Sequence, residues 1–109
     1  MAKGLKTNRR TADGAFLSYS FRNTMSGWLR KLVITVDSSA TGFVYIYDDS
    51  AAATGTMLYG GAIEQASSTA SVTFRTVNVD WPGAGVFFSN GLYLDISGGT
   101  TAVQAYWDE

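Results

Sequence analysis

The sequence predicts an all-β protein, a single antiparallel β-sandwich of the jelly-roll or immunoglobulin-like type with seven or eight short strands. Three observations support this fold. Apolar and polar residues alternate in short runs, turn-forming residues separate the runs about every ten residues, and no segment favours a helix longer than one turn. The length of 109 residues suits one domain, which we expect at residues 15–109 behind a flexible basic N-terminal arm at residues 1–14.

The first half of the domain contains three predicted strands. The apolar positions of the first two alternate with other residues and are, in chain order, Leu17, Tyr19, Phe21, Leu32, Ile34 and Val36. The third strand follows the turn DSSATG and places Val44 and Ile46 on one face and Tyr45 and Tyr47 on the other. Because this strand is apolar on both faces, it is either central or covered on one side by a partner.

The second half is predicted to contain the remaining strands. The segment DDSAAATGTMLYGG allows at most one helical turn, because Gly55 and Gly60-Gly61 interrupt it. Strands are predicted in IEQAS, SVTFRTVNVDW, VFFS, LYLDIS and residues 103–107. Asn90-Gly91 predicts a hairpin between VFFS and LYLDIS, and Gly98-Gly99 predicts a final hairpin that closes one sheet.

The net charge of −1 conceals an asymmetry between the head of the chain and its body. Seven of the eight basic residues lie within the first 31 positions, against one acidic residue, Asp13, so the head carries a formal charge of +6. The rest of the chain carries Arg75 and eight acidic residues, a formal charge of −7. Residues 1–14 lack hydrophobic periodicity, which predicts an extended arm that is flexible unless a partner holds it.

The sequence contains neither cysteine nor histidine, which excludes disulfides, thiolate metal sites and the commonest general base. Asp48-Asp49 with Asp95 could bind Ca²⁺, but a turn started by the aspartates explains the same residues. Glu64 with Asp80 or Asp95 could form a carboxylate pair for glycoside chemistry, although any nine acidic residues supply such pairs. We therefore expect no catalytic residues, no metal and no cofactor.

The N-terminus lacks the apolar segment of a secretory signal. No apolar run approaches the roughly 20 residues of a membrane span. We therefore expect a protein that is made in a cytoplasm and has no membrane partner.

Two groups of residues are candidates for partner binding, Lys3, Lys6, Arg9 and Arg10 in the arm and Tyr45 and Tyr47 in the two-sided strand. Aromatic residues make up 14% of the chain, and they favour the rim of a core or a protein interface. Exposed aromatic rows also bind sugars, so a carbohydrate-binding module is an alternative. Nucleic acid is not favoured, because the basic residues are spread and match no nucleic-acid-binding motif.

The segments LRKLVITV, TGFVYIYDDSAAATGTMLYG and VFFSNGLYLDISGGTTAVQAYW resemble, in their order, small all-β structural proteins encoded among the head and tail genes of tailed bacteriophages. The shared pattern is an apolar strand, a Gly-aromatic strand ending in Tyr-Asp, a small-residue loop closing on Gly-Thr, a GLYL-x-I-S-G strand and a final strand ending in aromatics. These features fall at residues 32–36, 42–48, 50–56, 91–98 and 103–107. The resemblance covers residues 28–107 and leaves out the arm.

The resemblance implies a virion structural protein without catalytic residues, above all a capsid decoration or cement protein that bridges subunits of the major capsid protein. A head-fibre, neck or tail component is the alternative within this class. We also expect a homo-oligomer, because a small sandwich exposes sheet edges and this chain has one proline and few lysines to protect them. Icosahedral shells offer three-fold positions, which favours a trimer.

Overall fold

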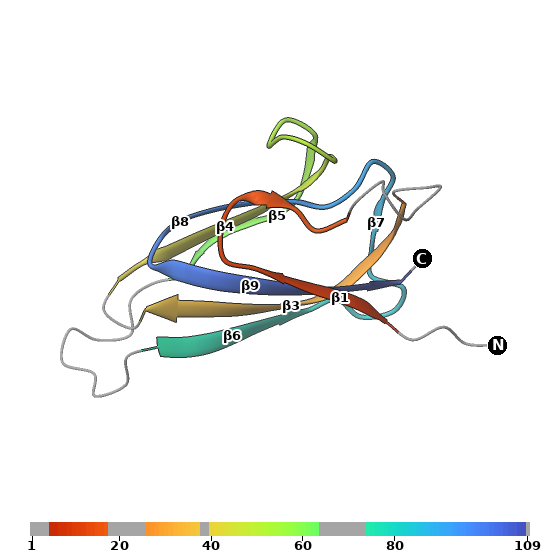
Figure 1. Cartoon of the computed structure of the whole chain (residues 1–109). Coiled ribbons are helices and arrows are strands. Elements are labelled where there is room, and N and C mark those ends of the chain that lie inside the picture. Colours follow the sequence, from red (N-terminus) through yellow and green to blue (C-terminus); the bar gives the residue numbers. More distant parts are fainter. Residues whose placement is uncertain (1–4, 18–25, 38–39, 64–73, 109) are drawn as a thin grey trace.

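The computed structural model describes residues 5–17, 26–37, 40–63 and 74–108, and every regular element among them is a β-strand. These strands form two antiparallel sheets (Figure 1). Sheet A has the order β1-β9-β3-β6, with β7 also paired to β3, and sheet B has the order β2-β8-β4-β5. The strands of sheet A are β1 Lys6–Arg10, β3 Gly27–Asp37, β6 Phe74–Asp80, β7 Val86–Phe88 and β9 Thr100–Asp108, and those of sheet B are β2 Gly14–Ala15, β4 Gly42–Asp48, β5 Thr56–Ile63 and β8 Tyr93–Gly98. The predicted all-β, antiparallel architecture is confirmed.

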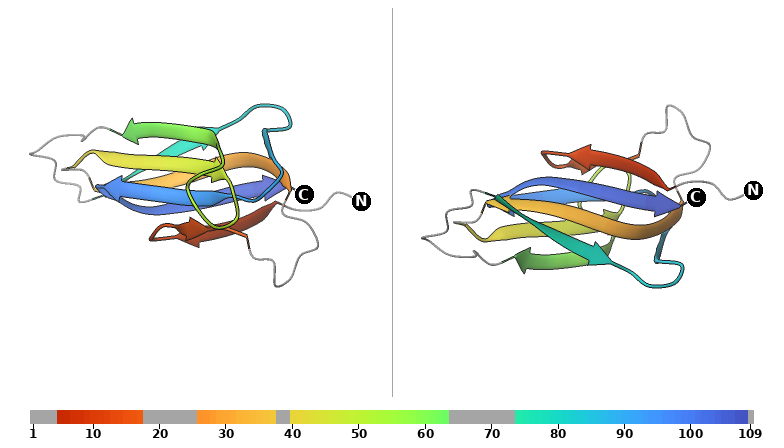
Figure 2. Two further views of the ribbon diagram at one scale, coloured as in Figure 1. Left: turned by 90° about the horizontal axis from the view of Figure 1, so that it is seen from above. Right: turned by 90° about the horizontal axis from the view of Figure 1, so that it is seen from below.

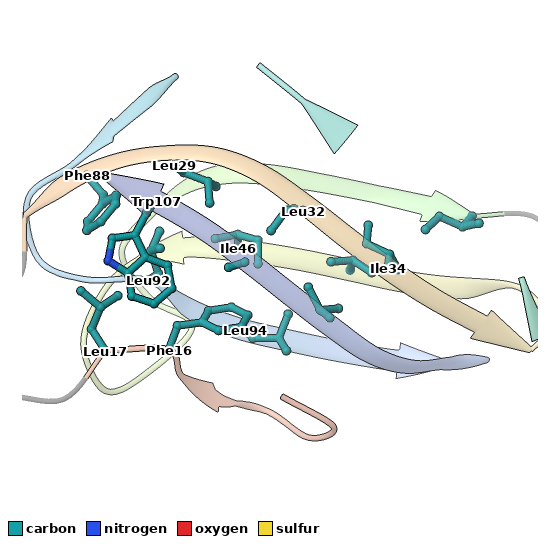
Figure 3. Packing of buried hydrophobic residues seen from close by; sticks show 14 of the residues in the cluster. Phe16, Leu17, Leu29, Leu32, Ile34, Ile46, Phe88, Leu92, Leu94 and Trp107 are labelled. Carbon is teal, nitrogen blue, oxygen red and sulfur yellow. The ribbon is translucent and has the colours of Figure 1, made fainter. Parts of the chain in front are cut away.

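The inner faces of the two sheets share one hydrophobic core (Figure 3). Alternate residues of β3 and β4 enter it, and their side chains are fully buried, namely Leu32, Ile34, Val36, Val44 and Ile46. Aromatic rings gather at one end of the core, where Phe16, Phe88 and Trp107 lie near one another. Each buried side chain of this size stabilises the fold by about 1.5–3 kcal/mol, so the shared core holds the two sheets together.

The pairing of the strands is nested about the connection between β4 and β5. β4 pairs with β5, β3 with β6, β2 with β8 and β1 with β9. The chain therefore resembles a long hairpin in which the first four strands lie beside later strands in reverse order. The hairpin is wound on itself, because β8 also pairs with β4 and β9 also pairs with β3. As a result β1 and β2 lie along one side of the molecule and β5 along the other (Figure 2).

Both hairpins predicted in the second half of the chain are wrong. β7 pairs with β3 in sheet A while β8 lies in sheet B, and β8 and β9 also lie in different sheets. At Gly98-Gly99 the chain crosses between the sheets, and Gly98 has a φ of +65° that favours glycine. The Gly99 N–H donates to the Thr41 carbonyl and the Gly99 carbonyl accepts from Asp37 N–H, each at 2.9 Å. These bonds join this crossing to the one between β3 and β4.

The N-terminal segment also differs from the prediction. Residues 6–10 form β1, which pairs with β9 over its whole length, and residues 14–15 form β2. The Asn8 side-chain amide donates to the Phe16 carbonyl at 2.9 Å, which ties β1 to the segment that follows β2. An arm without regular structure is therefore wrong for residues 6–10, and residues 1–4 lie outside the described part. Most of the strands predicted at residues 17–21 and in IEQAS also lie outside it.

Candidate binding surfaces

The outer surface of sheet B carries a row of aromatic side chains. Tyr45 and Tyr47 point away from the core, opposite to Val44 and Ile46, as the sequence predicted. Residues directly opposite each other in a sheet share a face, and Tyr47 lies between Tyr93 of β8 and Met57 of β5. We call this surface the aromatic face, and its residues are Phe43, Tyr45, Tyr47, Met57 and Tyr93.

The aromatic face is bordered by small residues and carries little charge. Tyr45 lies opposite Gly60 of β5, and Phe43 lies opposite Ala62. A Cβ on Gly60 would come within 2.5 Å of the Met57 Sδ and 3.0 Å of the Tyr45 ring, so both side chains lie over this glycine. Among the described outward-facing residues of β4, β5 and β8, Asp95 alone is charged. Such a surface can pack against a protein or stack on a flat apolar ligand.

The outer surface of sheet A is polar by comparison. Lys31 of β3 lies between Tyr106 of β9 and Asp80 of β6. Arg30 occupies a bulge in the pairing of β3 with β9, and its guanidinium forms an ion pair with Asp108. Both partners of this pair are about one-third exposed, so the pair contributes little to stability.

One corner of sheet A is apolar. Trp28 of β3 and Phe87 of β7 lie directly opposite each other, and their ring centroids are 5.3 Å apart with the rings tilted by 58°. The two side chains are 38% and 53% exposed. The signal for this pair in the sequence is the run VFF, because two adjacent phenylalanines in a strand must point to opposite faces.

The four basic residues proposed for partner binding have different surroundings. The guanidinium of Arg10 donates to the backbone carbonyls of Ala12, Asp13 and Ala15 at 3.1–3.2 Å and therefore holds the turn between β1 and β2. Lys6 and Arg9 are exposed on β1 and remain candidates for a partner. Lys3 lies outside the described residues. The structure does not bring Lys6 and Arg9 together with Tyr45 and Tyr47, because β1 edges sheet A and β4 is inside sheet B.

The paired aspartates at the end of β4 organise the neighbouring loops. The Asp48 carboxylate accepts hydrogen bonds from Ser89 N–H at 3.0 Å and Asn90 N–H at 2.6 Å. The Asp49 carboxylate accepts from Ala51 N–H at 2.9 Å, Ala52 N–H at 3.2 Å and the Thr54 hydroxyl at 3.0 Å. The bond from Ala51, followed by that from Thr54, lowers the pKa of Asp49 below its ordinary value of 3.8. These contacts confirm the turn predicted for the two aspartates.

The carboxylate pairs considered from the sequence each include Glu64, so the described structure tests neither of them, but it places Asp80 and Asp95. Asp80 lies on the outer face of sheet A opposite Lys31, and Asp95 lies on the outer face of sheet B opposite Tyr45. Stacked sheets are about 10 Å apart, so these two carboxylates are too distant for joint acid–base chemistry. Glu64 lies outside the described residues. Within the described ranges there is also no group of three or more acidic side chains that could hold a metal ion.

No protein-family model, curated protein or solved structure matches this chain. In the part of the chain that the structure describes, no helix has the length and apolar character needed to cross a membrane.

Proposed function

We propose that this chain is a bacteriophage virion structural protein, a capsid decoration protein that stabilises the shell by bridging subunits of the major capsid protein. The observation that carries the proposal is the aromatic face, which leaves Tyr45, Tyr47 and Tyr93 half-buried and Met57 50% exposed. Large amphipathic rings with a low charge density are typical of the central part of protein interfaces. Burial of this face would stabilise the shell by ~25 cal/mol per Å² before the cost of association.

We further propose that the sandwich is of the jelly-roll type. The nested pairing of β1 with β9, β2 with β8, β3 with β6 and β4 with β5 supports this type over an immunoglobulin-like one. Jelly rolls are frequent among viral capsid domains and lectins, which supports a virion role and keeps sugar binding as an alternative. The phage-protein resemblance of residues 28–107 adds support for the virion role.

The test is binding of the purified protein to shells assembled from the major capsid protein of the same phage. The double variant Tyr45→Ala/Tyr47→Ala should bind these shells at least tenfold more weakly, because anchors at an interface centre often contribute ~2 kcal/mol or more. The matched control is Val33→Ala/Gln104→Ala on the outer face of sheet A, which should bind within about twofold of the natural protein. Co-sedimentation and the number of copies per virion measure the outcome. A dozen copies or fewer would move the protein to the neck or tail.

A carbohydrate-binding module is the second candidate, because the same row of Tyr45, Tyr47 and Tyr93 lies beside one carboxylate, Asp95. Aromatic rings stack on the apolar faces of sugars, and a carboxylate accepts hydrogen bonds from sugar hydroxyls. A glycan array separates the two candidates. Specific glycan binding that the tyrosine variant abolishes, together with no shell binding, would favour the module.

A further inference from the structure

In the part of the chain that the structure describes, the outer strands of the sheets are β1, β6 and β7 in sheet A and β2 and β5 in sheet B. A free edge exposes backbone N–H and C=O groups, and proteins protect such edges with charges, proline or short strands. β1 carries Lys6, Arg9 and Arg10, and β6 carries Arg75 and Asp80. β2 and β7 are short, with two and three residues. β5 is different, because its eight residues TMLYGGAI include neither a charge nor a proline.

The regular part of β5 is residues 59–63. Leu58 is the extra residue of a bulge, because Tyr59 lies opposite Ile46 and Met57 lies opposite Tyr47. From Tyr59 to Ile63 each residue of β5 lies opposite one residue of β4. Bulges twist an edge away from pairing, so the first half of β5 is partly protected while residues 59–63 are not. No described strand pairs with the far side of this segment.

We infer that residues 59–63 form a contact with a second copy of this chain, in which two β5 strands pair antiparallel and extend sheet B across a two-fold axis. The absence of charge means that two copies meet without like-charge repulsion, whereas two copies of the basic β1 would repel each other. The segment is also self-complementary when the axis passes through its centre at Gly61. Gly60 then lies opposite Ala62 of the second copy, and Tyr59 lies opposite Ile63 of the second copy.

This register is favourable on the inner face of the extended sheet. A tyrosine opposite an isoleucine is an aromatic and β-branched pair, which stabilises antiparallel strands. On the outer face the junction residues are Gly60 and Ala62, and the Met57 and Tyr45 side chains that lie over Gly60 would be close to the second copy. The inference does not depend on a virion role, and its two-fold symmetry distinguishes it from the trimer that shell symmetry favours.

Cysteine cross-linking tests the register directly, because the chain contains no cysteine. In Gly61→Cys the two thiols would face each other across the axis, where directly opposed Cα atoms are ~4.5–5.5 Å apart and a disulfide fits. A Cβ at this position meets the Tyr59 hydroxyl at 3.3 Å, so the Tyr59 side chain would have to shift by a few tenths of an ångström. In the control Ala62→Cys the two Cα atoms would be ~8 Å apart, beyond disulfide reach.

We expect Gly61→Cys to form a disulfide-linked dimer under mild oxidation at least tenfold faster than Ala62→Cys. Equal rates for the two variants, or no dimer from Gly61→Cys, would overturn the proposed register. Circular dichroism of both variants would verify that the sheets are intact.

The second measurement uses the mass of the free protein in sedimentation equilibrium. The natural chain should be a dimer, and Ala62→Lys should dissociate at concentrations at least tenfold higher, since two lysines would then lie near the axis. Thr76→Lys, an exposed change on the β6 edge, is the control and should remain a dimer. A monomeric or trimeric natural chain, or an equal effect of the two lysines, would contradict pairing through β5.

Discussion

In sheet A the outer face carries an ion pair and polar residues, and the outer strands β1 and β6 are charged, whereas in sheet B the outer face is aromatic and β5 has no charge. The inner faces do not show this difference, because β3 and β4 contribute side chains that are buried alike. The packing of the two sheets therefore requires apolar side chains on their inner faces only. The contrast between the outer faces supports the proposal that the aromatic face of sheet B binds a partner, although sheet A also exposes Trp28 and Phe87 at one corner.

The equivalence of the two inner faces predicts the largest effects on stability. Ile46→Ala in sheet B and Ile34→Ala in sheet A should each lower the free energy of unfolding by about 2–4 kcal/mol, because both side chains are fully buried and each change leaves a cavity. Urea denaturation measures both values. If Ile46→Ala lowered the free energy of unfolding by less than about 1 kcal/mol, the inner face of sheet B would contribute less to the core than that of sheet A.

Arg10 provides a smaller effect, confined to the edge of sheet A. Arg10→Ala removes the donors for three backbone carbonyls in the turn between β1 and β2 and should lower the free energy of unfolding by about 1–2 kcal/mol. Arg10→Lys should lower the free energy of unfolding by about half as much as Arg10→Ala. Its ammonium can still donate to some of these carbonyls, but it cannot reproduce the planar fork of the guanidinium. Unchanged stability of Arg10→Ala combined with weaker shell binding would instead make Arg10 a partner contact.

Strands with an apolar face were predictable from the sequence, and strands without one were not. The alternation in β3 and β4 follows from burial of every second side chain, and it correctly located Val44, Ile46 and the outward Tyr45 and Tyr47. β1 has no such signal, because its inward positions at the sheet edge are Lys6, Asn8 and Arg10, opposite Trp107, Ala105 and Val103. Only pairing with β9, about a hundred residues away in the sequence, makes this segment a strand.

The glycine pairs were misinterpreted for a similar reason. A glycine with positive φ permits a sharp change of direction, but distant contacts decide whether the chain returns to the same sheet or crosses to the other. At Gly98-Gly99 those contacts are Asp37 and Thr41. The sequence predicts that Gly60-Gly61 bounds a segment with at most one helical turn, whereas both glycines lie inside β5, where Gly60 leaves room for the ring of Tyr45. The contribution of Met57 to the aromatic face was missed for this reason.

The smallest predicted effect concerns Asp49 in the loop that joins β4 and β5, and it depends on pH. Hydrogen bonds to its carboxylate lower its pKa in the folded protein below 3.8. The charged form therefore stabilises the folded state above the pKa of the unfolded chain, and this contribution is lost as the pH falls through the lower folded value. A carboxyl ¹³C titration should place the pKa of Asp49 below 3.8, and Asp49→Asn should unfold at a lower urea concentration than the natural chain at neutral pH but not at about pH 2. Asp95→Asn on the aromatic face is the control. This change removes a carboxylate to which no described hydrogen bond is donated. A pKa at or above 3.8, or a pH-independent difference for Asp49→Asn, would show that this loop of sheet B is held by packing and not by its carboxylate.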